Sequence, residues 1–276
     1  MAEFPPIFPG APSARPALVG VVHLPPLPGS PRYPVATGGV ETAGGFDRFV
    51  LEPALADARA LREGGADAVI VENFGDVPFF ADRAPSETVA AMAVAARAVR
   101  EACGLPLGVN VLRNDADAAL SVAAAAGASF IRVNVLAGAM VTDQGLVQGR
   151  AAEVLRKRRA LGLDAVHIWA DVLVKHASPL VARPLEEDLH ELLDRSLADA
   201  VIVTGAGTGR ATDADLVAEV RRLSHGAPVL IGSGVNEQTA NGYGAQGLIV
   251  GTWLKRQGQL AEPVDPGRVR RLRDRL

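Results

Sequence analysis

Eight short apolar runs, spaced almost evenly along 276 residues, constrain the fold of this chain more than any other feature. Each run ends in a polar or glycine-rich turn, and seven of the eight follow a stretch that can form or contain a helix. Continuous Val, Ile and Leu runs of this length are typical of strands buried on both faces, as in a parallel sheet. The runs cover residues 18–24, 68–73, 107–112, 130–135, 166–172, 200–205, 228–234 and 247–252.

Repeated strand–helix units predict an α/β protein with a single closed (β/α)8 barrel, the TIM-barrel fold, which usually takes ~250 residues. We expect the barrel to span residues 18–276, and the Pro-rich residues 1–17 to form an extended arm outside it, over the barrel bottom or a neighbouring molecule. The active site of such a barrel lies in the loops that follow the strands. Helices are expected at residues 46–63, 86–102, 114–126, 150–161, 184–197, 212–223 and 265–276, whereas 236–244 has room for barely one turn.

Composition argues against several classes of protein. A formal net charge of −3 without a basic stripe disfavours nucleic-acid binding. The single cysteine, Cys103, permits neither an intrachain disulfide nor a multi-cysteine metal site. No apolar stretch reaches the ~18 residues that span a bilayer, and the N-terminus does not resemble a signal peptide. These features predict a cytoplasmic protein with no membrane span, and the slim, alanine-rich helices favour a homo-oligomer.

Two connections are longer than the fold requires. Residues 25–45 follow the first strand, and residues 136–149 follow the fourth. Long loops without secondary structure of their own are usually functional in a compact domain, often as lids. Both loops are expected at the face where the strands end, with harmless surface insertions as the alternative.

Strand alternation predicts which polar side chains face the barrel interior. In residues 166–172 every second position is apolar and suits the helix-facing side, so His167, Trp169 and Asp171 must face inward. Arg132 and His167 lie lower and are expected to form a structural charge network. Any single inward polar group can be a satisfied interior residue, but a whole ring favours a ligand, because unpaired polar groups are costly to bury. The predicted ring at the barrel mouth comprises His23, Glu72, Asn110, Asn134 and Asp171.

Asp171 is the leading candidate for a catalytic acid or base. It ends an inward-facing run, and Lys175 and His176 follow in the next loop, so cationic groups are expected beside the carboxylate. Glu72 is the second acid/base candidate, and His23 completes the catalytic set. Lys175 would neutralise developing charge or form a Schiff base, with a solvated loop lysine as the alternative. The predicted substrate-binding residues are Asn110, Asn134, Asp143, His176 and Thr204.

Glycine-rich turns follow the last three predicted strands. Glycine lets the backbone approach phosphate oxygens closely, and in many barrels the loops after the seventh and eighth strands bind phosphate. Glycine is also common in tight turns, but three such turns at one face favour phosphate binding. The predicted phosphate-binding residues are Gly205, Gly232, Ser233, Gly234, Gly251 and Thr252.

No organic cofactor is predicted, because the sequence has no dinucleotide fingerprint, P-loop, HExxH, GxSxG or CxxC motif. A divalent metal is the alternative to a metal-free site. The HxH pair that many barrel metallohydrolases carry on the first strand is absent, which disfavours a metal. The side chains that could collect one are His23, Glu72, Asp143, Asp171 and His176.

Several longer motifs, between residues 18 and 265, resemble the BtpA family. The motifs are VGVVHLPPLPGSPRY, GVNVLRNDA, FIRVNVLAGAMVTDQGLVQG, ADVLVKHASPL, ADAVIVTGAGTG, PVLIGSGV and GLIVGTWLK. The resemblance implies a (β/α)8 barrel of the phosphate-binding type. The family is named for a role in photosystem I biogenesis, and the resemblance brings no catalytic residues with it.

Two functions are therefore weighed. The first is an isomerase-, aldolase- or lyase-type enzyme that acts on a phosphorylated small molecule, either a sugar or a nucleotide-like metabolite. The alternative is a non-catalytic assembly or stability factor for a protein complex, as the family name suggests. A factor of that kind is expected to expose a large apolar patch.

Overall fold

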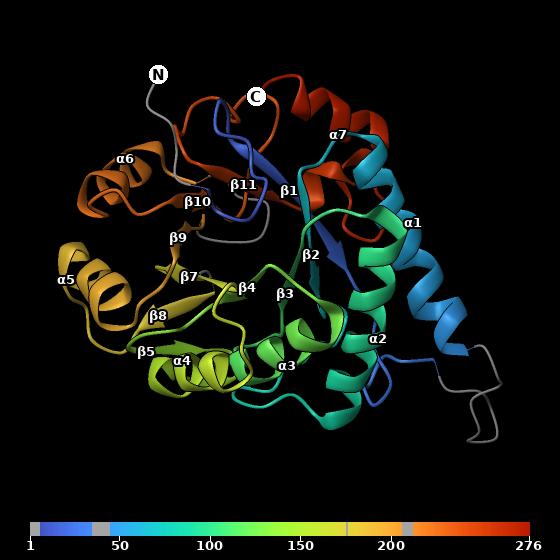
Figure 1. Cartoon of the computed structure of the whole chain (residues 1–276), viewed down its shortest axis with the longest axis horizontal. Helices are drawn as coiled ribbons and strands as arrows, with labels where there is room; N and C mark the ends of the chain where they lie inside the picture. The colour runs from blue at the N-terminus through green and yellow to red at the C-terminus, as the bar shows by residue number, and fades with distance from the viewer. Residues whose placement is uncertain (1–5, 35–44, 175, 206–211) are drawn as a thin grey trace.

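The computed structural model describes residues 6–34, 45–174, 176–205 and 212–276. Eight parallel strands close a barrel in the order β1-β11-β10-β9-β7-β4-β3-β2, and helices surround it (Figure 1). Seven of the eight apolar runs contain one of these strands and the first overlaps β1, which begins one residue earlier, so the predicted TIM barrel is confirmed. The barrel strands are β1 (Ala17–His23), β2 (Ala68–Glu72), β3 (Leu107–Asn110), β4 (Phe130–Val133), β7 (His167–Val172), β9 (Ala200–Val203), β10 (Val229–Ile231) and β11 (Gly247–Val250).

Helices connect the strands much as the sequence predicts. Asp115 caps the start of α3 by accepting a hydrogen bond from Ala118 N, and Asp265 caps α7 in the same way. No described helix lies between β10 and β11. Among the described residues, no helix is both long enough and apolar enough to cross a membrane. The helices are α1 (Glu52–Glu63), α2 (Ser86–Cys103), α3 (Ala116–Ala126), α4 (Ala151–Ala160), α5 (Leu185–His190), α6 (Ala214–Leu223) and α7 (Pro266–Arg273), with short turns η1 (Asp47–Leu51), η2 (Glu191–Arg195), η3 (Thr252–Leu254) and η4 (Arg256–Gly258).

Aromatic side chains fill the bottom of the barrel, where the strands begin. The rings of Phe130 and Trp169 stack with centroids 3.6 Å apart, and Phe8 packs against both. Trp169 Nε1 donates a hydrogen bond to the carbonyl oxygen of Ile7 at 3.2 Å. Ile7 and Phe8 belong to the predicted arm, yet both are buried. The arm thus lies over the bottom of the barrel at these two residues, one of the two positions expected for it, and the aromatic rings there bury it.

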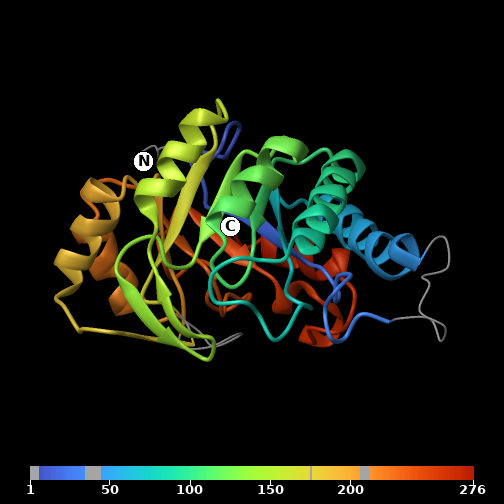
Figure 2. The same cartoon turned by 90° about the horizontal axis from the view of Figure 1, so that it is seen from below.

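A small antiparallel sheet adds to the barrel on the side where the strands end. Its strands β5 (Ala139–Thr142), β6 (Gly145–Gln148) and β8 (Ala177–Pro179) pair in the order β6-β5-β8. Figure 2 shows the β5–β6 hairpin (yellow-green) on the same side as the β2–α2 loop (teal). The loop at 136–149 therefore has secondary structure of its own, contrary to the prediction. The other long loop, 25–45, lies partly outside the described residues.

Candidate ligand site at the mouth of the barrel

Two adjoining cavities open where the barrel strands end, with volumes of about 260 Å³ and 320 Å³. We call the smaller one the glycine cavity and the larger one the polar cavity. Glu72, Phe74 and Arg132 line both, so the two cavities form one continuous site. The polar cavity is also lined by Phe79, Asn110, Leu112, Arg113, Asn134, Asp143 and His176.

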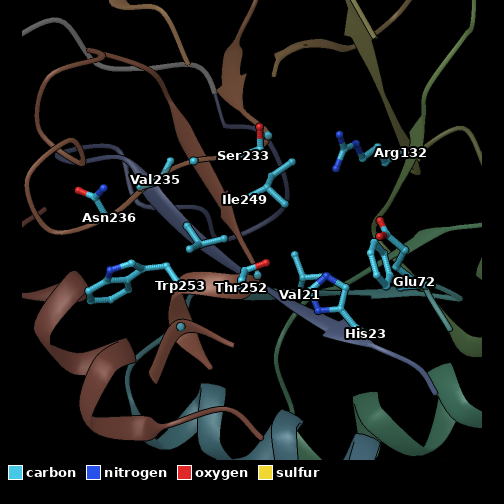
Figure 3. Close-up of a pocket in the computed structure, with 16 residues that line it drawn as sticks. Val21, His23, Glu72, Arg132, Ser233, Val235, Asn236, Ile249, Thr252 and Trp253 are labelled. Atoms are coloured by element: carbon cyan, nitrogen blue, oxygen red, sulfur yellow. The ribbon is translucent and has the colours of Figure 1, made fainter. Parts of the chain in front are cut away.

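The glycine cavity brings together the predicted residues of the last two turns. Figure 3 shows Arg132 and Glu72 on one side of this cavity and Ser233 and Thr252 across from them. The Gly205 N–H donates to Ser233 Oγ at 2.9 Å, so Gly205 adjoins the cavity without lining it, while residues 206–211 of that turn lie outside the described residues. The predicted residues that line it are Gly232, Ser233, Gly234, Gly251 and Thr252.

Glycine is required at two of these positions for different reasons. Gly234 has a φ of +71°, a conformation that side chains with a Cβ rarely adopt. At Gly251 a Cβ would lie 2.5 Å from Cε1 of His23, so only glycine lets the imidazole pack against the backbone there. The His23 ring also meets Phe74 edge-on, with centroids 5.0 Å apart. The imidazole predicted to be catalytic thus forms part of the cavity wall.

Strand register explains how the polar cavity is built. In the parallel pairing, His23 lies opposite Glu72 and Glu72 lies opposite Asn110. Three neighbouring strands therefore end at one level with polar side chains. Asn110 Nδ2 donates to Glu72 Oε2 at 2.6 Å, which holds the buried carboxylate in place.

Arg132, and not Asp171, is the residue of this pair that lines the cavities. Asp171 lines neither cavity, whereas Arg132 lines both. Arg132 donates from Nε and Nη2 to the two Asp171 oxygens at 3.0 and 2.8 Å, and their side chains are only 4% and 0% exposed. Arg132 lies opposite Trp169 in the register, two positions before Asp171, and its long side chain still reaches both cavities. The Asp171 carboxylate is thus enclosed by Arg132 and Asn134 rather than open to the mouth, and the Lys175 expected beside it lies outside the described residues.

Two buried guanidiniums, Arg113 and Arg132, lie among the carboxylates of this region. Burial opposes the charge on Arg132, but the attraction of Asp171 and then Glu72 leaves the pKa of the guanidinium above its ordinary value. Burial lowers the pKa of Arg113, and Asp171 and Asp143 partly offset that effect. Both groups stay protonated near neutral pH, because guanidinium is so strong a base. Because Asp171, Glu72 and Asp143 balance these charges, what Arg132 offers an anionic ligand is the guanidinium N–H groups that Asp171 does not use.

Asn134 holds a buried acceptor that the protein leaves unused. Its Nδ2 donates to Asp171 Oδ2 at 3.0 Å, but Oδ1 has no hydrogen-bond partner among residues 6–34, 45–174, 176–205 and 212–276. A buried polar atom without a partner costs about 1–3 kcal/mol. Because Asn134 lines the polar cavity, a ligand hydroxyl or N–H could satisfy this oxygen.

The small sheet carries two further candidates to the polar cavity. Thr142 pairs with Ala177 across β5 and β8, so Asp143 and His176 come next to this pair at the edge of the sheet. Both line the polar cavity. The cavity thus has carboxylate and imidazole groups on a wall that is separate from the barrel strands.

Some predicted residues do not reach the site, and others were missed. Thr204 Oγ1 donates to the Leu173 carbonyl at 3.3 Å and lines neither cavity, so its predicted contact with substrate is not supported. Lys175 lies outside the described residues. Arg113 and Phe74 were missed, although each follows the end of a barrel strand within three residues, a position that could have identified them.

The described residues contain no group of three or more His, Cys, Asp and Glu side chains placed to hold a metal ion. The five predicted metal-ligand candidates are divided by the fold. His23 lines the glycine cavity, Asp143 and His176 the polar cavity, Glu72 both, and Asp171 neither.

The closed barrel and the cavities at its mouth define the class of this protein. It is a TIM-barrel protein with a polar, glycine-lined site where the strands end. Sequence comparison then places it: the chain belongs to the BtpA family, whose sequence model matches residues 14–276. The photosystem I biogenesis protein BtpA of Synechocystis is 45% identical over 91% of this chain and 85% of its own length. An uncharacterized protein of Thermococcus kodakarensis is 47% identical, over 94% of each chain.

Solved structures agree on the fold. N-(5'-phosphoribosyl)anthranilate isomerase of Pyrococcus furiosus superposes with a TM-score of 0.55 at 15% identity, covering 95% of this chain and 98% of that one. Orotidine 5'-phosphate decarboxylase of Pyrococcus horikoshii gives a TM-score of 0.51 at 13% identity, covering 94% and 98%. At these identities the similarity shows a shared barrel and nothing about activity.

Proposed function

We propose that this protein is an enzyme of the isomerase, aldolase or lyase type that acts on a phosphorylated sugar or nucleotide-like metabolite. One observation carries the proposal: the glycine cavity and the polar cavity share a carboxylate, Glu72, and a guanidinium, Arg132. A substrate whose phosphate lies among the glycine turns would extend its carbon skeleton past Glu72. Such fixed placement of reacting groups supplies much of enzymatic rate enhancement.

The phosphate would be bound by backbone N–H groups and by one cation. Turns rich in glycine present N–H groups to phosphate oxygens, and guanidinium forms charge-assisted hydrogen bonds to them. Ser233, Gly234, Gly251 and Thr252 supply the backbone, and Arg132 supplies the charge. Asp171 then has a positioning role, because it orients Arg132 through two hydrogen bonds.

Glu72 is the proposed acid/base. In an isomerisation it would take a proton from a carbon or hydroxyl of the substrate and return it to a neighbouring atom, so no co-reactant is needed. Asp143 or His176, on the small sheet, would exchange the second proton. Asn134 Oδ1 would accept a hydrogen bond from a substrate hydroxyl. The names of two structural neighbours, the phosphoribosylanthranilate isomerase and the orotidine 5'-phosphate decarboxylase, are compatible with this substrate class.

Thermal-shift measurements with inorganic phosphate and ribose 5-phosphate test the proposal. A ligand that binds only the folded state raises the melting temperature. We expect this rise for the unchanged protein and for Gly162→Val, and its loss in Gly234→Val. Gly162 is the matched control, because it has a φ of +67° and ends a helix away from the mouth. Equal ligand-induced rises in the two variants would remove the glycine cavity as the phosphate site.

A second candidate function rests on the outer face of the small sheet. Val141 and Leu146 pair across β5 and β6 and are each 46% exposed, and Leu180 and Val181, just beyond β8, are 57% and 70% exposed. Exposed apolar groups at one place are typical of protein-binding surfaces. This surface favours the role of an assembly factor, in line with the name of the Synechocystis relative. Pull-down with a Leu180→Asp/Val181→Asp variant would test it.

A further inference from the structure

A third cavity, of about 280 Å³, adjoins the polar cavity at the mouth. Phe79 and Leu112 line both of them, so a ligand in the polar cavity can extend into this one. We call it the apolar cavity, because apolar residues, among them two phenylalanines and three prolines, make up most of its walls. Its other lining residues are Gly29, Ser30, Pro31, Asn73, Asp76, Pro78, Phe80, Ala84, Pro85 and Thr88.

The acidic and amide groups of the apolar cavity are already engaged in holding its walls together. Asp76 Oδ1 accepts from Leu27 N at 2.7 Å, which fixes the loop after β1. Asn73 Oδ1 accepts from Leu112 N at 2.7 Å, and Asn73 Nδ2 donates to Asp76 Oδ2 at 3.2 Å. These bonds join the loops after β1, β2 and β3 around one hollow. What the hollow offers a ligand is therefore mainly apolar surface.

Phe80 is the most exposed large aromatic side chain in the described part of the chain. Its side chain is 59% exposed although it lines a cavity. Its backbone is held, because Arg113 N donates to the Phe80 carbonyl at 3.3 Å. An exposed ring at the rim of an apolar hollow, tied to a residue of the polar cavity, is typical of a ligand-binding wall rather than of a core.

We propose that the apolar cavity binds a flat aromatic or heteroaromatic group of the same substrate whose phosphate lies in the glycine cavity. The substrate class is then a sugar phosphate that bears an aromatic ring, such as a nucleoside monophosphate. Phenylalanine rings and proline faces suit a flat partner, because aromatic groups gain from offset or edge-to-face packing. The proposal rests on the proposed function, since it assumes a phosphate in the glycine cavity and a sugar between the two.

Isothermal titration with matched ligands tests the shared substrate. Uridine and adenosine 5'-monophosphate should bind at least ~10-fold tighter than ribose 5-phosphate, the scale of one well-packed ring. Ala84→Phe fills the apolar cavity and should remove this gain, while the affinity for ribose 5-phosphate stays unchanged. Ala90→Phe places the same ring on the exposed side of α2 and is the control.

Ligand-observed NMR with indole tests the ring site without any phosphate. We expect indole to bind the unchanged protein and Ala90→Phe but not Ala84→Phe, with inorganic phosphate bound at the same time. Nucleotides that bind no tighter than ribose 5-phosphate would overturn the shared substrate and leave the proposed function standing. A third outcome is that indole binds and Ala84→Phe abolishes this binding, but neither phosphate nor ribose 5-phosphate binds. This result would overturn the proposed function and keep the ring site. Indole binding that Ala84→Phe leaves intact would remove the ring site.

Discussion

The two ends of the barrel are made by the same strands and differ in what the strands enclose. At the bottom, Phe130 and Trp169 stack at 3.6 Å, and the indole N–H is satisfied by the Ile7 carbonyl. At the mouth, Asn134 Oδ1 is buried without a partner among the described residues, and Arg132 lines two cavities. The bottom is closed by its own chain, whereas the mouth leaves polar atoms for another molecule.

This difference arises within single strands. On β7 the inward position after Trp169 is Asp171, and along β4 the inward series runs from Phe130 through Arg132 to Asn134. Side chains alternate between the barrel interior and the helices along the whole of each strand. What changes from the bottom to the mouth is that the inward residue becomes polar. Closing the barrel does not require polar groups at the mouth, since apolar ones close the bottom. Their presence there is best explained by a ligand.

The largest expected loss of stability comes from a substitution in the aromatic cluster at the bottom of the barrel. Trp169→Ala removes the fully buried indole and leaves a cavity, which should lower the free energy of unfolding by about 3–5 kcal/mol. Urea denaturation measures the loss, and phosphate affinity of the folded variant should be unchanged. The other tryptophan is the control, because Trp253 lines the glycine cavity and is partly exposed. Trp253→Ala should cost less stability and weaken phosphate binding. The reverse pattern would contradict the contrast between the two ends.

The second-largest loss of stability is expected for Asp171→Asn, at a residue between the two ends of the barrel. It leaves the buried Arg132 without its counter-charge, and breaking a buried ion pair typically costs about 3–5 kcal/mol. We expect a loss near ~3 kcal/mol, because asparagine keeps one hydrogen-bond acceptor. Chemical denaturation is the measurement. An unchanged free energy of unfolding together with a large loss of turnover would restore Asp171 as a catalytic residue and refute the positioning role.

Glu72→Gln tests the contrast between the two ends of the barrel by changing a residue at the mouth. The amide keeps the shape and can still bond Asn110, so the stability of the barrel should change little. Once a substrate is found, turnover should fall by ~100-fold or more, the scale of acid/base catalysis. Steady-state kinetics and thermal unfolding of the same preparation separate the two effects. Full activity in Glu72→Gln would exclude Glu72 as the acid/base.

Much of the barrel could be predicted from the sequence because its signals are local. Apolar runs identified every barrel strand, and alternation placed Trp169 correctly inside. Glycine turns after β10 and β11 identified five residues that line one cavity. Each of these features depends on a few neighbouring residues and on a fold that places all strand ends at one face.

The errors concern side-chain reach and long-range pairing. Strand alternation gives the direction of a side chain but not how far it reaches or which partner it takes, so it did not show that Arg132 lines both cavities or that it encloses Asp171. The small sheet joins residues 139–148 to 177–179, and such pairing between separate loops leaves no local pattern. The arm was expected over the barrel bottom, but the burial of Ile7 and Phe8 there could not be predicted locally, because it depends on rings that come more than 120 residues later.

The smallest expected effect concerns Asp143, which the small sheet brings to the mouth from outside the barrel. Its side chain is exposed and lines the polar cavity, so Asp143→Ala should change the free energy of unfolding by less than about 0.5 kcal/mol, as surface substitutions do. The control Asp274→Ala removes an exposed carboxylate beyond α7, away from the mouth. Calorimetric titration with ribose 5-phosphate should show an affinity change of several-fold for Asp143→Ala and none for Asp274→Ala. Identical affinities in the two variants would show that Asp143 makes no ligand contact and would leave His176 as the residue of the small sheet that lines the polar cavity.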